Sequence, residues 1–234
     1  MCTVTLVPRG DGGVRVMCNR DEQRTRPAAV APRLHRLGER VAVFPEDPQG
    51  GGTWIGANDA GLAAALLNRH GRDAPASRGA AVSRGLIIPT LLEHASLDAA
   101  LEVVRELDPG VFEPFQLVAV QEARVGVATS TGRMLATRVS ALVQPLLFTS
   151  SSLGDDRVDA PRRRLFERLV LGRADAWLEG QARFHRHRWR SRPQISVWMA
   201  RADAVTVSRS VVEVTPRAIR MTYTPLVEPP DVVP

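Results

Sequence analysis

The chain has 234 residues, of which 44% are hydrophobic and 24% charged, and its formal net charge is +6. A chain of this length can bury a sizeable core without disulfides or a structural metal, and we expect residues 1–225 to form one domain followed by a proline-rich tail, residues 226–234. Its basic side chains other than histidine are all arginine, which excludes Schiff-base lysine enzymes and P-loop nucleotide hydrolases.

Composition also limits the compartment and the partners. No apolar run of about eighteen residues occurs, and the N-terminus does not resemble a signal peptide, so we expect a cytoplasmic protein without a membrane span. Two cysteines are too few for a disulfide framework and no zinc-binding spacing occurs, so neither a metal nor a resident cofactor is expected. Twelve arginines fall between residues 157 and 201. Because no nucleic-acid-binding motif accompanies them, we expect no nucleic-acid partner.

In the first half of the chain, short apolar runs between turn residues predict five strands: residues 3–7, 14–18, 41–44, 53–55 and 61–67. A loop that ends in the glycines Gly50 to Gly52 precedes the fourth strand. Apolar residues then recur at helical spacing over residues 77–92, which predicts a helix. A second helix begins at Ser96, a good N-cap residue, and stops before Pro109-Gly110.

The second half repeats this grouping of strands with strands and helices with helices. Strands are predicted at residues 115–120, 125–129, 134–137, 146–150, 195–199, 204–207, 211–215 and 218–223, and helices at residues 161–172 and 174–184. Such grouping favours an α+β fold over a doubly wound parallel sheet. Two antiparallel sheets covered by helices fit this order.

The first two strands predict a hairpin that joins the chain start to a charged cluster. If the turn Gly10-Asp11-Gly12-Gly13 is centred between its second and third residues, Cys2 lies directly opposite Asp21. A one-residue irregularity would place Cys2 opposite Arg20 or Glu22 instead. Residues directly opposite one another have Cβ atoms about 5 Å apart, so the cluster would surround the cysteine.

This geometry predicts a chemical role for Cys2. Removal of Met1 would give Cys2 a free α-amino group, with a pKa of about 7.7–8.0, beside its own thiol. The amine can act as general base for that thiol, a nearby arginine favours the thiolate, and a nearby carboxylate orients the amine. The five histidines, at positions 35, 70, 94, 185 and 187, form no motif with either cysteine.

Simpler interpretations exist for each of these residues. Cys2 can stand second by chance, and Arg20, Asp21 and Glu22 can be a solvated strand end. Cys18 is best interpreted as a small buried residue. His185 and His187 alternate with arginine and are expected to be exposed. The three glycines predict a close backbone approach or a positive φ, and Trp54 beside them is either a core residue or part of a pocket wall.

Several motifs together resemble the NRDE family, also called the Transport and Golgi organization protein 2 family. They are Met1-Cys2, Asn19-Arg20-Asp21-Glu22 with Arg26-Pro27, Gly51-Gly52-Thr53-Trp54-Ile55-Gly56, the stretch from Gly61 to Asn68, and Ser77-Arg78-Gly79. The likeness covers most of residues 1–120. The family is similar to N-terminal nucleophile hydrolases, especially bile-salt hydrolases and penicillin V acylases, which implies a four-layer αββα sandwich.

The resemblance implies roles for single residues. Cys2 would be nucleophile and base on a non-peptide C–N amide bond of a small molecule, and Arg20 and Asp21 would position its amine and thiol. Asn68 would supply an oxyanion-hole amide, although a turn residue at a strand end is an equal interpretation. Residues in or beside the motifs would line the substrate pocket: Asn19, Glu22, Gly52, Trp54 and Ser151.

The C-terminal half departs from the family pattern. The nearest match to a Ser-Asn pair is the stretch Thr149 to Ser152, and a late catalytic arginine has only Arg192 or Arg201 as candidates. Some members of the family are linked to haem movement. A non-catalytic carrier of haem or another apolar ligand on the same scaffold is therefore the alternative function, although no haem-attachment motif occurs.

Overall fold

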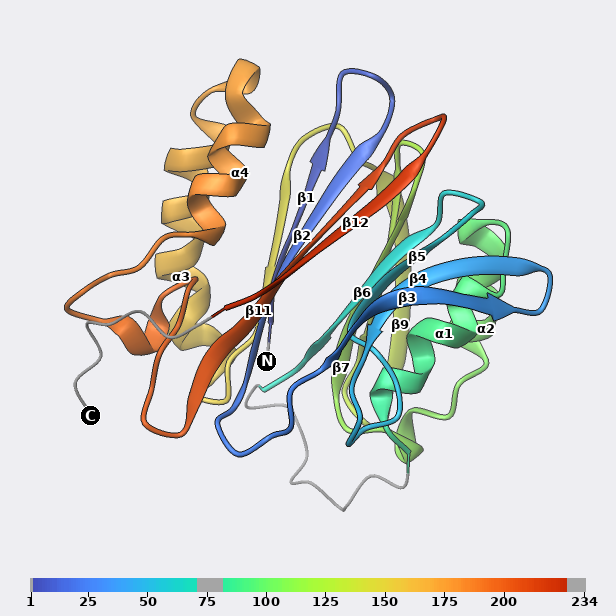
Figure 1. Cartoon of the computed structure of the whole chain (residues 1–234), viewed down its shortest axis with the longest axis horizontal. Helices are drawn as coiled ribbons and strands as arrows, with labels where there is room; N and C mark the ends of the chain where they lie inside the picture. Colours follow the sequence, from blue (N-terminus) through green and yellow to red (C-terminus); the bar gives the residue numbers. More distant parts are fainter. Residues whose placement is uncertain (1, 71–81, 227–234) are drawn as a thin grey trace.

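The computed structural model describes residues 2–70 and 82–226. Two antiparallel β-sheets pack face to face, and helices cover the outer face of each, so the layers follow the order α, β, β, α (Figure 1). The α+β sandwich predicted from the sequence is confirmed. None of the helices in the described ranges is long and apolar enough to cross a membrane.

The first sheet contains the chain start and the last two strands. Its order is β10-β1-β2-β11-β12, with β1 at Cys2–Pro8, β2 at Val14–Gln23, β10 at Leu146–Thr149, β11 at Ala204–Val214 and β12 at Ile219–Pro225. The outer face of this sheet is covered by α3 (Asp155–Phe166), which continues as a π-helical turn, and by α4 (Trp177–His185).

The second sheet runs in chain order from β3 to β9. Its strands are β3 (Val30–Leu37), β4 (Arg40–Glu46), β5 (Ile55–Asn58), β6 (Ala63–Asn68), β7 (Phe115–Gln121), β8 (Arg124–Ser130) and β9 (Leu135–Ala141). Its outer face carries α1 (Ile87–Leu92) and α2 (Leu97–Arg105), where the Ser96 side chain accepts from the Ala99 amide as the predicted N-cap.

Strand alternation divides the apolar residues among three cores. Val4, Val16 and Ile55 belong to the core between the sheets. The helices α1 and α2 pack on a second core, and α3 and α4 pack on a third that contains Phe166 and Phe184. Each sheet is therefore buried on both faces, which fixes the register of its strands.

Several predicted elements differ from the observed ones. The prediction missed β3 because its sequence carries Pro32 and three charged or histidine side chains. Residues 204–207 and 211–214 belong to one strand, since Ser208 and Ser210 between them are fully buried on the sheet face that carries Arg20 and Cys18. Residues 195–199 form no strand, and α3 begins at Asp155 rather than Pro161. The described part of the predicted 77–92 helix becomes helical only at residue 84; residues 77–81 lie outside the described ranges, as do residues 227–234 of the predicted tail.

The first hairpin forms as predicted, but its register differs by one residue. Cys2 lies opposite Arg20 rather than Asp21. The Arg9 amide donates to the Gly13 carbonyl, so the loop between them has three residues, and Gly12 ends it with a φ of +80°. A three-residue loop with a left-handed last residue is a standard hairpin connection, and its odd length shifts every pair by one.

A buried polar network joins α4 to β1 and β2. The two ring nitrogens of His185 contact Thr5 Oγ1 at 2.7 Å and Asn19 Oδ1 at 3.0 Å. Asn19 Oδ1 can only accept, so His185 Nδ1 donates to it and the neutral ring accepts at Nε2 from the Thr5 hydroxyl, which itself accepts from Gln181 Nε2. His185 is fully buried, which corrects the prediction that it is exposed, whereas His187 is half-buried. Burial lowers the pKa of His185 to about 3.

The low pKa of His185 predicts a pH-dependent stability. Between pH 3 and 6.5 the unfolded chain binds a proton that the folded His185 does not, so stability falls as pH falls through this window, by up to about 1.4 kcal/mol per pH unit for one histidine. We expect His185→Gln to reduce this slope, measured by urea unfolding at several pH values between 4 and 7. Equal slopes in the two proteins would contradict the assignment.

Candidate active site

Cys2 begins β1 and is held between two neighbouring strands. Its amide donates to Ser150 Oγ at 3.2 Å, and the Ser150 amide donates to the Cys2 carbonyl at 3.0 Å. On its other side it pairs with Arg20 in β2. Only 4% of Cys2 is exposed. Ser151 was predicted to line the pocket, but Ser150 is the serine that contacts the cysteine.

The second cysteine lies diagonally across from the first. Cys18 pairs with Val4, two residues along β1 from Cys2, and both thiols belong to the core between the sheets. A hydrogen bond from Cys18 lowers the pKa of the Cys2 thiol, with help from Arg20, although burial and Asp21 act in the opposite direction. The same interaction and burial raise the pKa of Cys18. Cys2 is therefore the more acidic thiol.

Arg20 connects Cys2 to a cluster of paired charges that we call the ionic cluster: Arg20, Glu22, Arg26 and Asp47. Arg20 is 4% exposed and stacks on the Trp54 ring, with 4.2 Å between the guanidinium carbon and the ring centre. It donates to Asp47 at 2.8 Å and to Glu22 at 3.3 Å. Arg26 donates to the same Asp47 oxygen at 2.6 Å. The NRDE and GGTW motifs thus meet in space.

Asp47 also shapes the glycine-rich loop. Its other carboxylate oxygen accepts from the amides of Gln49 and Gly50, and Gly51 has a φ of +68°. A Cβ atom on Gly52 would lie 2.3 Å from the backbone of Gly85, so this position requires glycine. Both uses of glycine that the sequence predicted, close approach and positive φ, therefore occur in this loop.

The segment that approaches Gly52 is Ser83-Arg84-Gly85, which the sequence analysis missed. The same tripeptide occurs at residues 77–79, outside the described ranges, and that earlier copy was chosen as the family motif. The Thr53 amide donates to the Gly85 carbonyl at 3.0 Å, and Arg84 Nη1 donates to the Pro114 carbonyl at 2.9 Å. The repeat of Ser-Arg-Gly in the sequence could have revealed this segment, because only the second copy lies immediately before α1.

Asp21 follows Arg20 but serves the opposite face of the sheet. It is 1% exposed and accepts from Thr206 Oγ1 at 2.5 Å. Burial raises the pKa of Asp21, while the nearby positive charges of Arg162 and Arg201 lower it. The buried Arg162 donates to the Thr3 and Thr149 hydroxyls and to the Ser196 carbonyl. Arg162 is therefore a further arginine from the C-terminal half that lies near Asp21, in addition to Arg201, which the sequence suggested. The other candidate, Arg192, is exposed and lies over the Trp189 ring.

Two residues expected in the pocket have other partners. Asn19 Nδ2 donates to the carbonyls of His185 and Val197, so this residue fixes the helix layer. The Ser151 amide donates to one Asp155 oxygen and the His70 amide to the other, which ties the end of β10 to the end of β6. Neither Asn19 nor Ser151 lines the cavity beside Cys2.

That cavity has a volume of about 530 Å³. Cys2, Arg20 and Asn68 line it, with Asn68 reaching it from the end of β6. The predicted pocket residues Glu22, Gly52 and Trp54 line it as well. Its wall also contains Arg26, Asp47, Arg84 and Glu113. No group of three or more His, Cys, Asp or Glu side chains in the described ranges is arranged to hold a metal ion.

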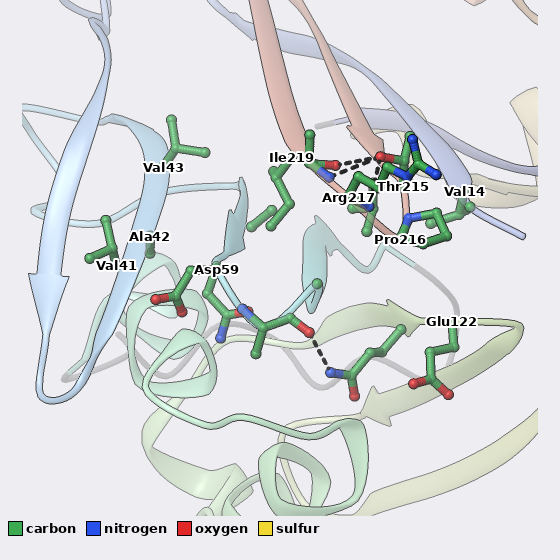
Figure 2. A pocket seen from close by; sticks show the side chains of 18 of the residues that line it. Val14, Val41, Ala42, Val43, Asp59, Glu122, Thr215, Pro216, Arg217 and Ile219 are labelled. Carbon is green, nitrogen blue, oxygen red and sulfur yellow. Dashed lines mark hydrogen bonds between the residues drawn. The ribbon is translucent and has the colours of Figure 1, made fainter. Parts of the chain in front are cut away.

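A second and larger cavity, of about 770 Å³, lies at the other end of the sandwich. Figure 2 shows Val41 and Val43 from β4 on one side of it, and Val14 and Ile219 on the other. Turns between strands form its rim, including Asp59, Glu122 and Arg217. The motif residues around Cys2 contribute nothing to it.

Several solved structures share this architecture. Penicillin V acylase from Agrobacterium tumefaciens is similar at 13% identity and a TM-score of 0.55, covering 96% of this chain and 86% of that one. The N-acylethanolamine-hydrolyzing acid amidase ortholog of Caenorhabditis elegans matches at 14% identity and a TM-score of 0.59, covering 90% and 92%. A variant of conjugated bile acid hydrolase from Clostridium perfringens matches at 11% and 0.50, covering 96% and 92%. A comparison with curated protein sequences gives no match.

These similarities identify the fold as that of the N-terminal nucleophile hydrolases. The family model described as Transport and Golgi organisation 2 matches residues 1–171, which is most of the chain. The protein therefore belongs to the Transport and Golgi organisation 2 family.

The contact between the glycine loop and Ser83-Arg84-Gly85 can be tested by substitution. We expect Gly52→Ala to destabilise the protein by about 1–3 kcal/mol, because its Cβ would overlap backbone atoms that cannot rotate away. Gly10→Ala is the control, since a Cβ there meets nothing within 4 Å. Chemical denaturation of both variants measures the difference, and equal stabilities would contradict the close approach.

Proposed function

We propose that this protein is an N-terminal cysteine hydrolase that cleaves a non-peptide C–N amide bond of a small molecule. The observation that carries the proposal is the placement of Cys2 at the start of β1, in a cavity of small-molecule size and directly opposite Arg20. The hydrolase fold of the similar structures supports it.

The chemistry requires that Met1 is removed, so that the α-amine of Cys2 becomes the general base. Cys2 Sγ attacks the amide carbonyl carbon while its proton passes to the amine. The amine then protonates the leaving nitrogen as the C–N bond breaks, which leaves a thioester. Water, deprotonated by the same amine, attacks the thioester and releases the carboxylic acid and the thiol.

The surrounding residues suit this sequence of steps. The Cys18 hydrogen bond, with a smaller contribution from Arg20, lowers the pKa of the Cys2 thiol. Ser150 holds the Cys2 backbone, and Asp21 supplies a buried carboxylate near the chain start. In the proposal Asp21 orients the amine, and Asn68, on the cavity wall, donates to the developing oxyanion.

The two thiols should differ in their reactivity. At pH 7 a mild alkylating agent should label Cys2 in preference to Cys18, because the pKa of Cys2 is lowered and that of Cys18 is raised. Cys2→Ser should keep the fold, and it should lower any amidase activity by two orders of magnitude or more. Peptide mapping of the labelled protein, thermal unfolding and hydrolysis of an amide library measure the three effects.

Two results would contradict the proposal. Intact-mass measurement that finds Met1 retained would remove the general base. A processed protein whose Cys2 reacts no faster than free cysteine would leave the hydrolase fold without its chemistry. Asp21→Asn should slow the labelling of Cys2 without unfolding the protein if the carboxylate positions the amine.

The cavity in Figure 2 favours a second candidate function, the binding of an apolar ligand. Valine and isoleucine side chains from both sheets face it, and its volume suits a ligand of drug-like size. Among the described residues that line it there is no His, Cys, Met or Tyr, so they offer haem none of the usual axial ligands. This candidate is therefore an apolar molecule other than haem.

An apolar dye such as Nile red tests this second candidate. We expect Val43→Glu to weaken dye binding by about tenfold, because it places a carboxylate on the apolar wall. Val139→Glu on β9 is the control, since that valine is exposed and away from the cavity. Fluorescence titration provides the measurement; equal dye affinity in both variants would exclude the cavity as the binding site.

A further inference from the structure

The three arginines of the Cys2 cavity differ in what neutralises them. Arg20 and Arg26 both donate to Asp47, and both lie within ion-pair distance of Glu22. Arg84 makes no ion pair with any residue in the described part of the chain, and the Pro114 carbonyl is its hydrogen-bond partner there. Arg84 therefore brings an unneutralised positive charge to the wall beside the nucleophile.

The position of Arg84 is fixed by its backbone. Gly85 packs against Gly52 and Thr53 so closely that a Cβ on Gly85 would lie 3.2 Å from the Thr53 amide nitrogen. The Leu86 amide donates to the Ser83 carbonyl, which closes a turn around Arg84. Together with the bond to Pro114, these contacts hold the guanidinium in the cavity wall. A surface arginine, in contrast, samples many rotamers.

Partial burial makes this charge unfavourable in the free protein. Burial lowers the pKa of Arg84, and the nearby carboxylates of Glu113 and Glu22 and the Cys2 thiol act in the opposite direction without forming an ion pair. A guanidinium with one carbonyl partner retains several N–H donors for a ligand. An anion that enters the cavity can use those donors and supply the missing counter-charge.

We propose that Arg84 binds a carboxylate of the substrate, so that the amide cleaved at Cys2 carries a carboxylate group close to its scissile bond. The amide part of this inference rests on the proposed hydrolase function, whereas anion binding beside Cys2 does not. A carboxylate suits the site better than a phosphate dianion, because the one guanidinium without an ion pair to a described residue balances one negative charge.

Two alkylating agents of nearly equal size test anion binding without any need for amidase activity. Iodoacetate and iodoacetamide both alkylate the Cys2 thiolate: an S–C bond forms to their CH₂ carbon as the C–I bond breaks and iodide leaves. Only iodoacetate carries a carboxylate. We expect Cys2 to prefer iodoacetate by about tenfold relative to the preference of free cysteine, as one charge-assisted hydrogen bond would give. Arg84→Gln should abolish this preference and leave the rate with iodoacetamide within about twofold.

Matched variants separate recognition from general electrostatics. Arg133→Gln removes the same charge from an exposed turn and should keep the preference, and Arg84→Lys should keep part of it. Acetate should slow the iodoacetamide reaction in the wild type and not in Arg84→Gln. Thermal unfolding of each variant checks that it is folded.

The opposite results are equally specific. An unchanged preference in a folded Arg84→Gln, or an equal loss of rate with both reagents, would overturn the proposal, the second because Arg84 would then act on the thiolate alone. Stronger protection by inorganic phosphate than by acetate would overturn the choice of a carboxylate. If the preference follows Arg84 but no amide is hydrolysed, the proposed function fails and the anion site stands.

Discussion

The antiparallel pairing of β1 with β2 is the constraint on which the candidate site depends. A three-residue loop sets the register so that Cys2 lies opposite Arg20. Because successive side chains on a strand point to opposite faces, the Asn-Arg-Asp-Glu motif is divided by its own strand. Arg20 and Glu22 reach the cavity, while Asn19 and Asp21 serve the side covered by α3 and α4. One tetrapeptide thus fixes the helix layer and lines the cavity.

This arrangement buries several charged side chains. Arg20, Asp21 and Arg162 are each less than 5% exposed. Burial of a charge is unfavourable unless hydrogen bonds replace the lost hydration, and Arg20 and Arg162 each donate to several acceptors. Removing Asp47 would leave Arg20 and Arg26 to share Glu22 at longer distances, and would take away the carboxylate that holds the glycine loop. The motifs are therefore coupled through electrostatics as well as through the backbone.

Sequence reasoning succeeded where the relevant contacts are local. The hairpin, the Ser96 cap and the special backbone of the glycine loop follow from residue types within a few positions of each other. It failed where the partner is distant in the chain. Ser150 contacts Cys2 across 148 residues, and Arg162 contacts Thr3 across 159, so no short motif contains either pair. His185 was misjudged for the same reason, since its charged neighbours in sequence say nothing of Thr5 and Asn19.

The two cavities lie at opposite ends of the same strands. β2 runs from Val14, on the wall of the larger cavity, to Glu22, on the wall of the Cys2 cavity. At about 3.3 Å per residue these positions are roughly 26 Å apart. One wall is apolar and the other charged, so the two cavities suit ligands of different chemistry. The packed core between the sheets separates the two cavities, so substitutions at the two ends should act independently.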